Sequence, residues 1–103
     1  MGTIPNEAVE ERTTVVLGAG WLRAPGAASS TARYTMAVRH GAKALREGFG
    51  RLKADFDTLC AAERAGRASL ILSNGERVAI ELKRTASEEA EFKVVGALPA
   101  AVG

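Results

Sequence analysis

The sequence has little of several residue types on which common chemistries depend. Cysteine and histidine each occur once in the 103 residues, and aromatic residues make up only 5% of them. Because Cys60 has no second cysteine, an intrachain disulfide and a multi-cysteine metal site are excluded, and a reducing compartment is favoured. Because His40 is the only histidine, a Ser-His-Asp or Cys-His catalytic unit would have to include it.

Long apolar runs are also missing. No stretch is long enough to cross a bilayer, and the first residues, MGTIPNEAVEER, lack the basic start and apolar core of a secretory signal. We therefore expect a cytoplasmic protein that has no membrane partner. A chain of this length, with 47% hydrophobic and 25% charged residues, is typical of one globular domain.

The charge is small but unevenly distributed. The chain carries +2 overall, with a basic middle between two mildly acidic ends. Residues 1–12 are polar and without periodicity, so we expect a flexible N-terminal arm there and a single α+β domain over residues 13–103.

The strongest periodic signal lies in the middle of the chain. Apolar residues recur at alternating spacings of four and three, a pattern that predicts an amphipathic helix over about residues 31–65. Ser29, Ser30 or Thr31 can cap its start, and Gly66 is a natural terminator. The stretch Gly48-Phe49-Gly50 leaves a kink or a break open as an alternative.

A hairpin is predicted after this helix. Asn74-Gly75 stands between two β-rich runs, and a three-residue loop with a left-handed Gly75 places Ala68, Leu70 and Leu72 on one face with Val78 and Ile80. Residues 13–17 and 92–95 are further strand candidates. The expected fold class is therefore α+β, with one long helix, continuous or kinked, packed on a small three- to four-stranded antiparallel sheet.

The lengths of these elements suggest a partner. A helix over residues 31–65 would reach about 50 Å, whereas strands of seven residues reach about 23 Å. Because soluble monomers rarely leave an apolar stripe bare, we favour a second chain, in a homodimer or from another protein, over a helix that folds back. The residues expected to form this self-association seam are Val38, Leu45, Phe49, Leu52 and Phe56.

A glycine motif near the start resembles a nucleotide-binding turn only briefly. TTVVLGAG supplies two of the three glycines of a dinucleotide fingerprint, but Arg23 occupies the third position. No Asp or Glu stands between Thr13 and Arg46 to hold a ribose, so we expect no cofactor.

Catalytic and metal-ligand patterns are likewise not evident, because the carboxylates are scattered and no metal-ligand spacing occurs. We expect a non-catalytic interaction module that acts as an adaptor, regulator or assembly component. The alternative is a nucleic-acid-binding regulator, because basic residues follow the apolar stripe by one position and would form a cationic helix flank. The residues of this flank are Arg39, Lys43, Arg46 and Lys53.

Overall fold

Most of the described chain forms strands in which buried and exposed side chains alternate. The computed structural model describes residues 12–41 and 46–99. Within these ranges, three long strands come first, β2 (Arg12–Arg23), β3 (Ser30–His40) and β4 (Arg46–Lys53), followed by helix α1 (Phe56–Ala65). Three strands complete the fold: β5 (Ala68–Ile71), β6 (Arg77–Ala86) and β7 (Glu89–Val94).

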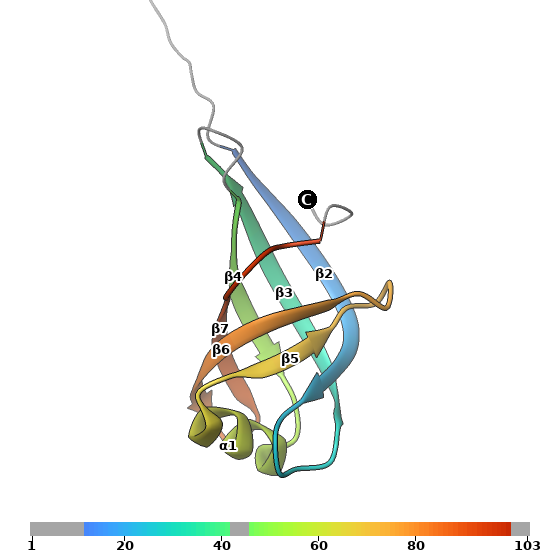
Figure 1. The fold of residues 1–103 in the computed structure, drawn as a ribbon, viewed down its shortest axis with the longest axis vertical. Helices are drawn as coiled ribbons and strands as arrows, with labels where there is room; N and C mark the ends of the chain where they lie inside the picture. Colours follow the sequence, from blue (N-terminus) through green and yellow to red (C-terminus); the bar gives the residue numbers. More distant parts are fainter. Residues whose placement is uncertain (1–11, 42–45, 100–103) are drawn as a thin grey trace, which may run out of the picture.

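The six strands close into a barrel (Figure 1). Every neighbouring pair is antiparallel, and the order around the barrel is β2-β3-β4-β7-β6-β5. The ring closes where Trp21, Leu22 and Arg23 of β2 pair with β5. Among the described residues, the part of β2 before this junction pairs with β3 alone, so the β2–β3–β4 sheet extends past the closed part of the barrel.

The expected α+β fold with one long helix is wrong. Of the predicted helix, the described residues 31–40 and 46–53 are strand, and the described helical residues are the last ten, Phe56–Ala65. In β3, burial repeats every second residue, with Ala32, Tyr34, Met36 and Val38 inside. This period of two belongs to a strand with one face in the core, so the spacing of four and three was a coincidence of apolar residues from both faces.

Gly48 and Gly50, where a kink of the helix was an alternative, have a different role. Gly48 and Gly50 lie within β4, and a Cβ atom on Gly50 would collide with the backbone carbonyl oxygen of Thr35 on β3. Glycine therefore permits a close approach of two strands at this point.

Helix α1 covers the end of the barrel where β3 begins (Figure 1). Its inner side buries Thr58, Leu59, Ala61 and Ala62. Ser30 Oγ accepts a hydrogen bond of 2.9 Å from the backbone N–H of Asp55, directly before the helix. Gly66 ends the helix in the left-handed conformation with φ of 83°, which confirms it as the terminator.

The predicted hairpin is confirmed in both register and turn. Leu70 is opposite Val78, and Ala68 is opposite Ile80, with all four side chains buried. The backbone N–H of Leu72 donates to the Glu76 carbonyl at 2.7 Å, which leaves a three-residue loop, and Gly75 has a φ of 90°. The predicted strands 92–95 and 13–17 correspond to β7 and to part of β2, but β2 continues to Arg23, and the residues that join it to β5 lie beyond the predicted strand.

The remaining expectations about organisation concern the ends of the chain. Residues 1–11 of the expected flexible arm lie outside the described residues, and Arg12 begins β2. No helix in the described part of the chain is long and apolar enough to span a membrane.

Candidate interaction face

The outer side of the β2–β3–β4 sheet carries side chains in rows that cross the strands. The register places Val15 beside Ala37, and Ala37 beside Phe49, so these three form one apolar row. The next row toward α1 starts with Leu17 on β2 and continues with Thr35 and Arg51. We call the outward side chains of these two rows the β2–β4 face; they are Val15, Leu17, Thr35, Ala37, Phe49 and Arg51.

Large apolar side chains on this face are open to solvent. Leu17 is 73% exposed, Val15 is 60% exposed and Phe49 is 42% exposed. Trp21, further along the outer side of β2, is 50% exposed. These side chains take no part in the core of the barrel, which is filled by the inward residues of the same strands. An apolar group of this kind on a surface marks a place of contact with another molecule.

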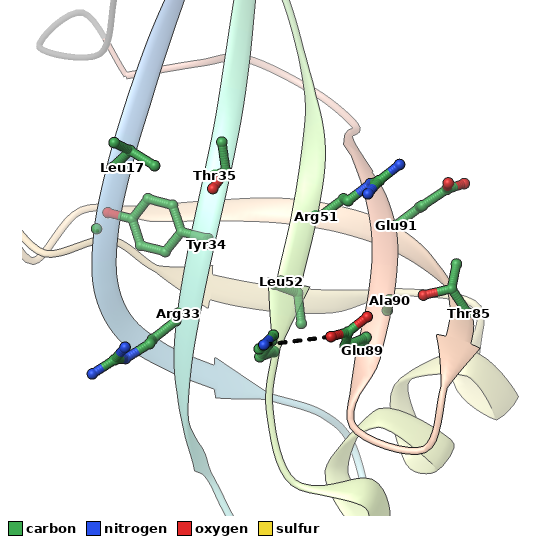
Figure 2. A pocket seen from close by; sticks show the side chains of 12 residues that line it. Leu17, Arg33, Tyr34, Thr35, Arg51, Leu52, Thr85, Glu89, Ala90 and Glu91 are labelled. Atoms are coloured by element: carbon green, nitrogen blue, oxygen red, sulfur yellow. Dashed lines mark ion pairs between the residues drawn. The ribbon is translucent and has the colours of Figure 1, made fainter.

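The face is hollowed over β3. Small side chains of Thr35 and Ala37 form the floor of a shallow cavity of about 690 Å³, with Val15 on one side and Phe49 and Arg51 on the other. A neighbouring cavity of about 660 Å³ extends toward α1 and is the one drawn in Figure 2. Leu17 borders it on β2, while Arg51 and Glu91 stand side by side on β4 and β7.

Charged groups frame the apolar row. Arg39 donates to Glu47 at 2.6 Å, and its guanidinium lies 6.0 Å from the centre of the Phe49 ring. Lys53 forms an ion pair of 3.5 Å with Glu89, the contact marked in Figure 2. Because these side chains are largely exposed, such pairs contribute little to the stability of the fold. Their main effect is to set which charges an approaching partner would meet.

Two arginines on this side have no ion pair within the described residues. Arg33 and Arg51 both point outward, from β3 and β4, and neither approaches a carboxylate within salt-bridge distance among residues 12–41 and 46–99. They border the cavity of Figure 2, together with Lys53. Arg33 and Arg51 were not among the predicted site residues, because a helical spacing does not group them with Arg39 and Lys53; a period of two does.

The residues of the expected seam do not share a surface. Val38 and Leu52 are buried in the barrel, whereas Phe49 is exposed on the outer side of β4. Phe56 is 45% exposed at the start of α1, where the Arg84 guanidinium lies 5.1 Å from its ring centre. Leu45 lies outside the described residues. The helical stripe that joined these residues therefore does not exist, and only Phe49 belongs to the β2–β4 face.

The expected cationic helix flank is likewise divided. Arg39 and Lys53 point outward, but Arg46 points inward and donates to the backbone oxygens of Leu98 and Pro99 at 2.9 and 3.2 Å. Lys43 lies outside the described residues. Arg46 and Lys53 are seven residues apart on β4, and an odd separation along a strand places two side chains on opposite faces.

The groups considered for catalysis are far apart. His40 ends β3, whereas Cys60 is a half-buried, free thiol on α1 that lines a cavity together with Ala28 and Ser29, just before the start of β3. An eleven-residue strand separates these regions by roughly 30 Å. Among the described residues, no group of three or more His, Cys, Asp or Glu side chains is placed to hold a metal ion.

The surroundings of Glu63 on α1 shift the pKa of its carboxyl group. The backbone N–H of Arg84 donates to its Oε2 at 3.0 Å, and the Arg84 guanidinium nitrogen Nε lies 3.5 Å from its Oε1. The backbone hydrogen bond, assisted by the positive charge of Arg84, lowers the pKa of Glu63. This contact ties α1 to β6, which is a structural role.

Compared with protein-family models, curated proteins and solved structures, the chain gives no significant match.

Proposed function

We propose that this protein is a non-catalytic interaction module that self-associates through the β2–β4 face. In this role it serves as an adaptor, regulator or assembly component. The observation that carries the proposal is the exposed apolar row Val15–Ala37–Phe49, extended by Leu17 on the same strand. Self-association is thus assigned to the outer side of a sheet and not to a helix.

The physical support is the hydrophobic effect. Burying a fully exposed Val, Leu or Phe side chain contributes about 1.5–3 kcal/mol, and these side chains remain 42–73% exposed in the isolated chain. The small residues Thr35 and Ala37 on β3 leave a cavity between Val15 and Phe49, which side chains from an opposing surface can enter. Self-association needs no other partner, and an outer sheet face can pack on its own copy.

His40 ends β3, and Cys60 lies on α1 near the other end of that strand, a separation that supports a role without catalysis. The free thiol of Cys60 supports a reducing compartment, and we propose the cytoplasm. A heterologous protein with a similar apolar surface is the other partner that this face can accept.

Light scattering coupled to size exclusion tests the proposal. The wild-type mass should rise with concentration, and Leu17→Glu should keep the chain monomeric because it places a charge within the apolar rows. Ala79→Glu is the matched control, since Ala79 is an exposed outward residue on β6, away from this face. A wild-type mass that stays monomeric at all concentrations would refute self-association.

Nucleic-acid binding is a second candidate, favoured by one specific observation. Arg33 and Arg51 point outward without ion pairs among the described residues, and the exposed rings of Trp21 and Phe49 lie beyond them along the sheet. Cations that neutralise phosphates, combined with aromatic rings that stack on bases, suit a single strand. The nearby carboxylates of Glu89 and Glu91 weigh against it.

Fluorescence anisotropy with a labelled single-stranded oligonucleotide tests this candidate. Binding at low salt that decreases steeply with added salt, and that Arg33→Glu abolishes, would support it. Arg77→Glu, an equal charge change on β6, is the control. No binding at low salt would refute it.

A further inference from the structure

The charges around the apolar row indicate how a second copy docks. Resting on the proposed function, we infer that two copies pack their β2–β4 faces together about a two-fold axis that runs across the strands along the Val15–Ala37–Phe49 row. In this arrangement each of the three residues meets its own counterpart in the second copy. The strands of the two sheets stay nearly aligned, as is usual when sheets pack face to face.

The pattern on β4 is complementary to itself about this axis. Glu47 precedes Phe49 by two residues and Arg51 follows it by two, so all three point to the same side. A half-turn about the row exchanges the positions before and after Phe49. Each copy's Glu47 therefore stands opposite the second copy's Arg51, and the interface contains this opposite-charge contact twice.

The two side chains are suited to this contact. Packed sheets lie about 10 Å apart, a distance that an arginine and a glutamate extended from opposite sides can bridge. Arg51 has no ion pair within the described ranges. Glu47 accepts a hydrogen bond from Arg39 at Oε1, and a carboxylate can accept a further donor.

Other two-fold axes bring like charges together. An axis along β3 would place Arg33 and Arg39 each opposite its own counterpart. An axis across the strands through the Leu17 row would do the same for Arg51 and Glu91. Like charges held opposite one another cost free energy, so both arrangements are disfavoured. On the chosen axis Lys93 meets its counterpart at the rim, and Lys93 already has Glu81 at 3.6 Å.

The contact area determines the strength of association. The facing surface covers three strands and a few rows, which places it at the low end of specific interfaces. We therefore expect a concentration-dependent dimer, in which the two Glu47–Arg51 contacts select the arrangement more than they add affinity.

Reciprocal charge reversal tests the arrangement by sedimentation equilibrium. Glu47→Arg and Arg51→Glu, each alone, should weaken self-association by about tenfold or more, because two like-charge contacts replace two opposite ones. The double variant should recover to within about threefold of the wild type. An equimolar mixture of the two single variants should associate as a heterodimer, whereas each variant alone stays monomeric.

Controls separate the possible failures. Arg77→Glu on β6 should associate like the wild type, and thermal unfolding checks that every variant remains folded. If the wild type dimerises but neither the double variant nor the mixture recovers, the arrangement is overturned while the proposed function stands. If the wild type is monomeric throughout, both are overturned. Dimers that no reversal weakens would place the contact elsewhere and overturn the arrangement.

Discussion

Tyr34 on β3 holds the turn at Ser73, 39 residues later in the chain. Its hydroxyl accepts a hydrogen bond of 3.0 Å from the backbone N–H of Ser73 and lies 3.3 Å from the Ser73 hydroxyl. The Tyr34 side chain is 4% exposed and passes beside Gly18, where a Cβ atom would collide with the ring. The β5–β6 hairpin is thereby attached to the opposite sheet of the barrel.

Removing this hydroxyl should destabilise the barrel. Tyr34→Phe removes the acceptor of the Ser73 N–H and so a partly buried hydrogen bond, which should cost about 0.5–1.5 kcal/mol in the free energy of unfolding. Urea denaturation measures the difference. Ser73→Ala is the control, because it keeps the backbone donor and should cost less; equal stability of Tyr34→Phe and the wild type would contradict the assigned role.

Substitution at Gly50 should also be costly. Gly50→Ala forces a methyl group against the Thr35 carbonyl, so β3 and β4 must separate. We expect a loss of about 1–3 kcal/mol in the free energy of unfolding, as for overpacked cores. Ala79→Ser on the exposed side of β6 is the control and should change stability by less than about 0.5 kcal/mol. A neutral Gly50→Ala would show that the strands do not approach closely there.

The stability of the barrel should depend on pH through Glu63. Its pKa is lowered in the folded state from a reference of 4.5, chiefly by the Arg84 backbone hydrogen bond. The charged carboxylate therefore stabilises the fold fully above the unfolded pKa, and this contribution is lost as the pH falls through the lower, folded pKa.

Comparison with Glu63→Gln isolates that contribution. The wild type should be more stable than the variant at neutral pH, and the gap should close as the pH falls through the folded pKa. Denaturation midpoints across this range measure the gap. A gap that stays constant with pH would contradict the role assigned to the charge.

The sequence predicts local features well and long-range ones poorly. The hairpin follows from Asn74-Gly75 and from alternation within a few residues, so its register is confirmed. In β3 and β4 the inward positions hold alanine, tyrosine and glycine as well as Val38 and Leu52, so the period of two is weak. The helical spacing is false because it combines the outward Phe49 with the inward Val38 and Leu52.

The candidate face could not be predicted for a related reason. Val15, Ala37 and Phe49 are far apart in sequence and become neighbours only through the registers of β2, β3 and β4. Phe49 was identified as a contact residue, but within a helical stripe. Arg51 lies on the same face as Phe49 because the two residues are two positions apart on a strand; on a helix they would not share a face.

The most direct test of self-association through this face is an intermolecular nuclear Overhauser measurement. In a sample that mixes isotope-labelled and unlabelled copies, the account predicts contacts between the Leu17 methyl groups of one copy and the Thr13 methyl group of the other, and between the two Phe49 rings. Intermolecular contacts confined to other surfaces, or none at concentrations near one millimolar (on the order of the weakest specific complexes), would contradict it.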